Sequence, residues 1–161
     1  MQFVPANPSF EARVRDSFAR QTAMRFIGAR LAEVVPGCCR IELPARAELG
    51  QQHGFVHGGI VAMIADSAGG YAAFSLMPAD VSILTVEFKI NLLAPARGEL
   101  LAAVGTVVKP GRTLSITRAE VFAQEQGRQM LVATMQQTLM AMQGMADEKD
   151  VDADRHGSNL I

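Results

Sequence analysis

One apolar segment, residues 58–79, limits what this chain can fold into more than any other feature. Asp66 is the only charged residue within it, and Pro78 marks its end. Residues 57–77 have the length and continuous apolar character of a buried helix. The segment is a poor membrane span, because it also contains Ser67, glycines and Pro78. A helix that is apolar on every side must be buried on every side, so the rest of the chain has to surround it.

The segments around this helix are predicted to form a sheet. Residues 81–91 alternate between two faces. The apolar face would consist of Leu84, Val86, Phe88 and Ile90, and the polar face of Thr85, Glu87, Lys89 and Asn91. The other predicted strands span residues 29–35, 38–43, 99–108, 112–124 and 128–142. Strands grouped around one helix predict an α+β fold with an antiparallel sheet. One sheet face and two edges would stay uncovered, so we expect a homodimer or homotetramer.

Both ends of the chain differ from this central domain, which we place at residues 28–142. Within an N-terminal segment, residues 1–27, the predicted element is an amphipathic helix over residues 9–24, with an apolar or half-apolar side chain every four positions from Phe10 to Thr22. It would cover the open sheet face or form a lid over a pocket, and covering is favoured. Residues 143–161 are rich in Asp and Glu, which predicts a mobile tail.

Charge and cysteine content narrow the possible partners. Fifteen basic and sixteen acidic residues nearly cancel, which argues against a nucleic-acid-binding protein. The N-terminus lacks a basic stretch followed by an apolar run, so a cytoplasmic location is expected. Cys38 and Cys39 are adjacent and belong to no metal-binding pattern, and we interpret them as strand residues in a reducing compartment. No metal and no membrane partner are expected.

A motif at the start of the central helix carries a family resemblance. Gly54-Phe55-Val56-His57-Gly58-Gly59 is followed seven residues later by Asp66, and residues 94–98 read Ala-Pro-Ala-Arg-Gly. In this order and spacing, and with the later pair Gly111-Arg112, the motifs resemble those of the PaaI-type hotdog-fold thioesterases. The resemblance covers residues 28–142. It implies a hotdog fold, in which a curved antiparallel sheet wraps one long helix. It also implies hydrolysis of an acyl-CoA thioester with no metal or redox cofactor.

The resemblance implies roles for single residues as well. Asp66 takes the place of the family's acid, which acts as general base or nucleophile, and the Gly58 backbone N–H polarises the thioester carbonyl. Gln51 occupies a position where relatives carry Asn or Gln. Thr85 matches a Ser or Thr that helps to orient the attacking water. Gly70 departs from the pattern, because some relatives carry Ser or Thr one turn after the acid.

The chemistry of these residue types agrees with such roles. A helix start presents free N–H groups and a partial positive charge, and Gly58 and Gly59 let a carbonyl approach the backbone closely. Burial would make Asp66 a better base near neutral pH. The alternative is a structural Asp held by neighbouring hydroxyls such as that of Ser67. For His57 we favour a ring hydrogen bond that fixes the helix start over a role as catalytic base.

Spacing along the helix predicts a site shared by two subunits. Gly58 and Asp66 are eight residues apart, which is about 12 Å at a rise of about 1.5 Å per residue. One thioester carbonyl cannot easily touch both within a single chain. If the central helices of a dimer run antiparallel, Gly58 of one chain faces Asp66 of the other.

Two further groups are candidates for substrate binding, and both have a structural alternative. The turn with Lys109, Gly111 and Arg112, with Arg97 nearby, would meet the phosphates of CoA or form an ordinary solvated hairpin. Either an acyl slot or plain core packing accounts for Phe55, Met63, Tyr71 and Phe74.

Two rival functions remain open. One is a non-catalytic hotdog protein that binds acyl-CoA, and the other is a hotdog enoyl-CoA hydratase. Hydratase chemistry typically pairs an Asp with a nearby His, whereas the first His after Asp66 is His156.

Overall fold

The computed structural model describes residues 3–145 of the chain. Its helices are α1 (Phe10–Arg20), α2 (Thr22–Ile27) and α3 (Gly58–Phe74), with a 3₁₀ turn η1 at Ala47–Leu49. Its strands are β1 (Arg30–Val35), β2 (Cys38–Pro44), β3 (Val81–Leu92), β4 (Leu100–Lys109), β5 (Leu114–Glu125) and β6 (Arg128–Gln143). The predicted tail from residue 146 onward, with His156, lies outside the described residues. Within residues 3–145, none of the helices combines the length and the hydrophobicity of a membrane span.

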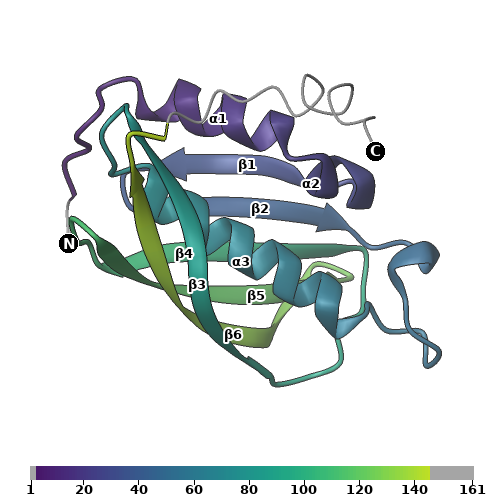
Figure 1. Cartoon of the computed structure of the whole chain (residues 1–161). Coiled ribbons are helices and arrows are strands. Elements are labelled where there is room, and N and C mark those ends of the chain that lie inside the picture. Colours follow the sequence, from purple (N-terminus) through teal and green to yellow (C-terminus); the bar gives the residue numbers. More distant parts are fainter. Residues whose placement is uncertain (1–2, 146–161) are drawn as a thin grey trace, which may run out of the picture.

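The six strands form one antiparallel sheet in the order β1-β2-β4-β5-β6-β3. The sheet curves around α3 (Figure 1). The helix packs against β2, β3, β4, β5 and β6, whereas the edge strand β1 lies farther from it. The predicted α+β arrangement, an antiparallel sheet wrapped around one long helix, is confirmed. Strands β1 and β3 form the two edges, so β3 pairs on one side only.

The core lies between α3 and the concave face of the sheet. Its fully buried side chains include Ile64, Ala68 and Phe74 from the helix and Ile41, Leu43, Leu101, Val121 and Leu139 from the strands. Full burial of one such large side chain stabilises the fold by about 1.5–3 kcal/mol. Gly105 lets β4 approach α3 closely, since a Cβ there would lie 2.2 Å from the backbone of Ala68.

Helix α3 is shorter and more open than the sequence predicts. It spans Gly58–Phe74, whereas the pattern predicts a helix over residues 57–77. The expectation of burial on every side is wrong for one stripe along the helix. The stripe follows the spacing of a single helix face. Its exposed or half-buried members are Gly59, Met63, Asp66 and Gly70. The sheet covers the opposite side of the helix, which leaves this stripe accessible.

Strand β3 does not keep the alternation that its sequence predicts. Its pairing with β6 shifts between Thr85 and Glu87, so that Val86 is an extra residue in a β-bulge. Ile83 and Ile90 both pack against the core, although strict alternation would place them on opposite faces. The predicted apolar face is therefore wrong, because the bulge changes which residues point inward. Three of its members are exposed, namely Leu84, Val86 and Phe88.

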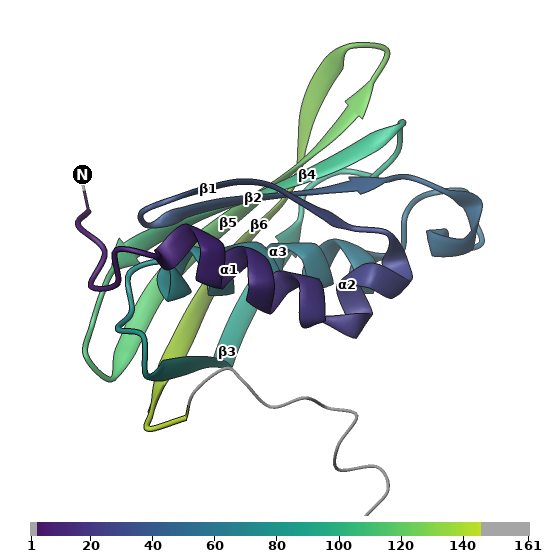
Figure 2. The same cartoon turned by 90° about the horizontal axis from the view of Figure 1, so that it is seen from above.

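The predicted N-terminal helix, residues 9–24, is divided into two helices. α1 ends at Arg20, because Gln21 adopts extended backbone angles (φ −73°, ψ 93°). α2 ends at Ile27 and is followed by Gly28, whose φ of 79° suits glycine. α1 lies beside β1, on the side of the sheet that holds α3 (Figure 1 and Figure 2). It leaves the outer face of the sheet uncovered, contrary to the favoured expectation.

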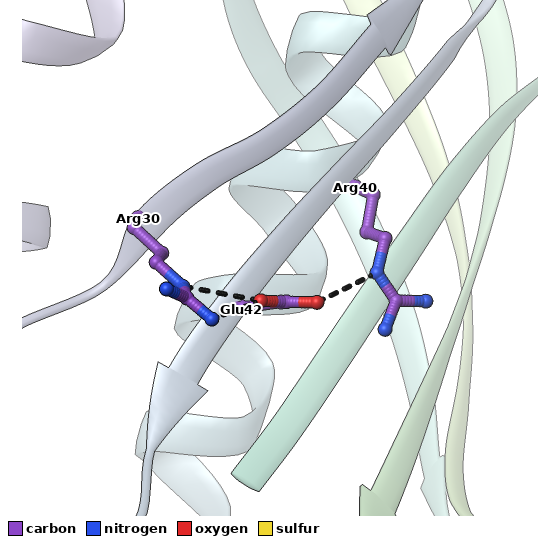
Figure 3. Close-up of polar contacts among 3 residues, drawn as sticks. All are labelled: Arg30, Arg40 and Glu42. Carbon is purple, nitrogen blue, oxygen red and sulfur yellow. Dashed lines mark hydrogen bonds and ion pairs between the residues drawn. The ribbon is translucent and has the colours of Figure 1, made fainter.

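An ion-pair cluster ties the edge strand β1 to β2. Glu42 accepts hydrogen bonds from Arg30 Nη2 at 2.7 Å and from Arg40 Nε at 3.0 Å (Figure 3). Its neighbours Ile41 and Leu43 are buried in the core, so Glu42 points to the outer face. Partial burial alone would raise the pKa of Glu42, but the two guanidinium groups hold it below its ordinary value. The link is therefore present at neutral pH and is lost as acid protonates Glu42.

Candidate active site

A ring nitrogen and an unpaired N–H define the start of α3. The N-cap residue is His57, whose Nδ1 accepts a hydrogen bond from the Gly59 N–H at 2.9 Å. This bond orients the ring and satisfies one of the free N–H groups of the helix start. The Gly58 N–H has no hydrogen-bond partner among residues 3–145. With the partial positive charge of the helix start, it is the donor available to a carbonyl oxygen.

A cavity of about 370 Å³ lies at this end of α3. Gln51, Phe55 and Gly58 line it. Leu92 at the end of β3 and the segment after it, Leu93, Ala94, Pro95 and Ala96, also line it. Gln51 Oε1 accepts a hydrogen bond from the His53 N–H. The amide nitrogen of Gln51 is therefore the end of this side chain that can donate to a ligand.

The Asp66 carboxylate is held at one oxygen and open at the other. Oδ1 accepts hydrogen bonds from Thr85 Oγ1 at 2.8 Å and from Gln137 Nε2 at 2.7 Å. Oδ2 has no hydrogen-bond partner within the part of the chain that the structure describes. The residue is half-buried, not buried as the sequence predicts. Because both donors act on Oδ1, the carboxylate has a fixed orientation and Oδ2 is free to accept a proton.

Gln137 is the residue at this site that sequence reasoning misses. Its Nε2 also donates to the Asp66 main-chain carbonyl at 3.0 Å, and its Oε1 accepts from Thr117 Oγ1 at 3.1 Å. The carbonyl of Asp66 can only accept, so the amide must turn its nitrogen toward Asp66. Gln137 is 1% exposed and Thr117 is 0% exposed. A buried polar network with all its bonds formed holds a single conformation, and this network ends at the acid.

A second cavity, of about 610 Å³, lies beside Asp66. Its apolar lining residues include Tyr71, Phe74 and Leu139. Its polar lining residues include Ser17 and Arg20 of α1 and Gln21, which follows α1. The hydroxyl of Ser67 donates to Gln21 Oε1 at 3.4 Å, so Ser67 is not the hydroxyl that holds Asp66. Met63, a predicted lining residue, packs against the core and lines neither cavity.

The two cavities share no lining residue. Gly58 borders the smaller one and Asp66 the larger one, and the two residues are about 12 Å apart along the helix axis. Within one chain, the N–H and the acid therefore face separate spaces.

The predicted CoA-binding residues belong to the lining of neither cavity. Lys109, Gly111 and Arg112 are exposed at the turn between β4 and β5 and line neither cavity. Arg97 pairs with Glu125 at 3.5 Å. Gly111 also has a structural reason to be glycine, since a Cβ there would lie 2.0 Å from a backbone carbonyl oxygen.

Neither cysteine is placed as a nucleophile. Cys38 and Cys39 are free residues of β2, in agreement with the predicted strand. Burial raises the pKa of the Cys39 thiol, and burial together with Glu33 raises that of Cys38, so both stay protonated at neutral pH. Among the described residues, no three His, Cys, Asp or Glu side chains gather in a group that could hold a metal ion.

Sequence comparisons relate a part of this chain to a thioesterase family, to an esterase and to a CoA-thioester hydrolase. The family model of the thioesterase superfamily matches residues 53–129. A protein of Halobacterium salinarum named as a putative esterase is 34% identical over 103 residues, which are 61% of this chain and 68% of the relative. A 1,4-dihydroxy-2-naphthoyl-CoA hydrolase of Listeria monocytogenes is 22% identical over 95 residues, which are 59% of this chain and 77% of that protein.

Solved structures have the same architecture. A thioesterase family protein from Silicibacter pomeroyi superposes with a TM-score of 0.83 at 50% identity, over 84% of this chain and 99% of that one. The PaaI protein from the phenylacetic acid degradation operon of E. coli superposes with a TM-score of 0.78 at 18% identity, over 88% and 99% of the two chains. The curved sheet around α3 is therefore the hotdog fold, and the chain belongs to the thioesterase superfamily as a thioesterase or esterase.

Proposed function

We propose that this enzyme hydrolyses acyl-CoA thioesters to the free acid and CoA, with Asp66 as general base. The proposal rests on one observation, the hydrogen bonding of the Asp66 carboxylate. Thr85 and Gln137 hold Oδ1, Oδ2 has no hydrogen-bond partner among residues 3–145, and Asp66 lines the larger cavity. A base with one fixed oxygen and one free oxygen is suited to orient and deprotonate a water molecule.

The reaction needs one water molecule between Asp66 and the substrate. As the water oxygen attacks the carbonyl carbon, Asp66 Oδ2 takes one of its protons. Negative charge develops on the carbonyl oxygen, to which the Gly58 N–H and the Gln51 amide donate hydrogen bonds. The C–S bond then breaks, the acid is released, and the CoA sulfur takes the proton from Asp66. Direct attack by Asp66 is the alternative, and a single turnover in ¹⁸O-labelled water distinguishes the two.

The site is completed between two copies of the chain. Gly58 and Asp66 of one chain border separate cavities, so a partner must bring the second group. The edge strand β3 supports such pairing, because it exposes Leu84, Val86 and Phe88 at 53%, 57% and 45% and has a free backbone edge. Antiparallel pairing of two β3 strands around a two-fold axis would run the two α3 helices antiparallel. A homodimer is therefore the smallest active unit, and a homotetramer would contain two of them.

CoA as the thiol part of the substrate is supported by a relative and by charge. The Listeria relative is named as the hydrolase of a CoA thioester. The exposed turn between β4 and β5 carries Lys109 and Arg112, whose positive charges suit the phosphates of CoA. The two free cysteines suit a reducing compartment, so we place the enzyme in the cytoplasm.

Thiol release from acyl-CoA substrates tests this function. The purified enzyme is incubated with benzoyl-CoA, phenylacetyl-CoA or hexanoyl-CoA and a thiol-detecting dye. We expect release from at least one substrate and almost none with Asp66→Asn. Tight binding without thiol release would support a non-catalytic acyl-CoA-binding protein instead. Loss of enoyl-CoA absorbance without thiol release would support a hydratase.

A further inference from the structure

Gly70 lies one turn after Asp66, on the same face of α3. It is half-buried and lines the larger cavity. A Cβ added at this position would have no atom within 4 Å, and the backbone has no positive φ. Glycine weakens a helix interior relative to alanine. Within one chain, neither packing nor backbone geometry therefore accounts for a glycine at position 70.

The adjacent glycine has the opposite environment. A Cβ at Gly69 would lie 1.7 Å from Gln137 Oε1 and 2.8 Å from Thr117 Oγ1. Gly69 is therefore needed to seat the buried network that holds Asp66. Of these two neighbouring glycines, Gly69 leaves space for the side chains of Gln137 and Thr117, whereas the space beside Gly70 belongs to the cavity.

Two buried aromatic side chains border the cavity that Gly70 lines. Tyr71 and Phe74 line the same cavity, and their rings meet edge to face with centroids 6.2 Å apart. Phe18 of α1 packs against Tyr71 in the same manner at 5.8 Å. The rings support one another, so they form a fixed wall. The cavity of about 610 Å³ is much larger than the cavity of about 150 Å³ that is known to hold benzene.

We propose that Gly70 sets the width of the acyl slot and selects thioesters with a bulky, ring-bearing acyl group. This inference rests on the proposed function, because it assumes that the acyl group lies next to Asp66. A ring seated over Gly70 has its carbonyl one helical turn away, at the acid, and contacts the edges of the aromatic wall. A side chain at position 70 occupies the same space and excludes the ring, but it leaves room for a short acyl chain.

The kinetic test compares Gly70→Ala and Gly70→Leu with the unmodified enzyme on phenylacetyl-CoA and acetyl-CoA. We expect Gly70→Leu to lower kcat/KM for phenylacetyl-CoA about 10- to 200-fold, the range that a misfit of methylene size produces in a pocket. Its kcat/KM for acetyl-CoA should change less than about threefold. For phenylacetyl-CoA, the kcat/KM of Gly70→Ala should lie between the values of Gly70→Leu and of the unmodified enzyme. An equal loss on both substrates, or no loss on either, would overturn the proposal.

A binding measurement separates this inference from the proposed function. Phenacyl-CoA is a thioether that cannot be hydrolysed, because a methylene separates its sulfur from its carbonyl. By calorimetry, we expect Gly70→Leu to bind phenacyl-CoA about tenfold or more weakly than the unmodified enzyme, with unchanged affinity for CoA. If no thioester is hydrolysed and this difference in affinity is still found, the proposed hydrolysis is rejected and the role of Gly70 in the acyl slot is supported. If phenacyl-CoA binds both proteins with equal affinity, or if the affinity for CoA falls by the same factor, the proposed role of Gly70 in the acyl slot is rejected.

Stability and assembly provide the controls. Gly70→Ala should unfold at the same temperature as the unmodified enzyme or higher, whereas Gly69→Ala should unfold at a lower one. Light scattering should give the same molecular mass for all Gly70 variants. A changed mass for Gly70→Leu would assign this glycine to the contact between subunits and overturn its role in the slot.

Discussion

The start and the middle of α3 supply the two halves of the proposed chemistry, and the chain builds them in different ways. At the start, the Gly58 N–H is flanked by His57, Gly59 and the Gln51 loop, all close in sequence. In the middle, Asp66 is held by residues 19 and 71 positions away, on β3 and β6. The hydrogen bond at the helix start is thus local, although Leu92 of β3 and Val132 of β6 also line its cavity, whereas the side-chain hydrogen bonds to the acid come entirely from the sheet. Changes at Thr85 or Gln137 should therefore affect the acid and leave the hydrogen bond at the helix start intact.

The largest effect is expected from removing the free oxygen of the acid. In Asp66→Asn, the amide oxygen can still accept the bonds from Thr85 and Gln137, but an NH₂ group replaces the oxygen that takes the proton. We expect kcat to fall about 10²- to 10⁴-fold, which is the contribution of general base catalysis, with little change in stability. Thiol release and urea unfolding measure the two quantities. Asp80→Asn, at an exposed position, is the control; activity in Asp66→Asn comparable to this control would remove Asp66 from the mechanism.

A hybrid dimer tests whether the two halves meet across subunits. Asp66→Ala and Gln51→Ala chains are coexpressed with different tags, and the hybrid is purified through both tags. One of its two sites then carries both substitutions and the other carries neither, so we expect about half of the unmodified activity. Each variant alone should have about 1% or less, because each lacks a base or an oxyanion donor. A hybrid no more active than its parents would place both residues of each site in the same chain.

Gln137 tests the dependence of the acid on the sheet. Gln137→Met keeps the volume but leaves the buried Thr117 hydroxyl without its acceptor and removes the amide donor to Asp66 Oδ1. We expect a loss of about 1–3 kcal/mol in the free energy of unfolding. Since misplacement of a catalytic group lowers the rate, kcat should fall about tenfold while KM changes little.

The adjacent residue provides the control for this substitution. Gln136 is exposed on the other face of β6, so Gln136→Met should change neither quantity. Equal kinetics for the two Met variants would show that the network stabilises the sheet without positioning the acid.

What the sequence predicts follows the same division between local and long-range structure. The helix, its polar start and Asp66 were accessible from one continuous segment, and the antiparallel sheet followed from the need to bury that segment. Gln137 lies between the buried Met135 and Leu139 on β6, but it is also next to another Gln. Which of the two faces inward depends on register with distant strands. The bulge at Val86 is equally invisible, because the alternating residues fit a regular strand until its partner is known.

The smallest effect is expected at the helix start, where His57 caps α3 through Nδ1. His57→Ala leaves the Gly59 N–H without its acceptor, and loss of an N-cap costs about 0.5–2 kcal/mol of stability. His53→Ala is the matched control, because that ring is exposed and makes no side-chain hydrogen bond within residues 3–145. Urea unfolding should therefore separate the two variants, with His53→Ala at the unmodified value. A structural His57 also predicts a pH–rate profile of unchanged shape in His57→Ala. If that substitution instead lowered kcat as much as Asp66→Asn does and removed one limb of the profile, the imidazole would be a second acid–base group, and the helix start would contribute more than backbone.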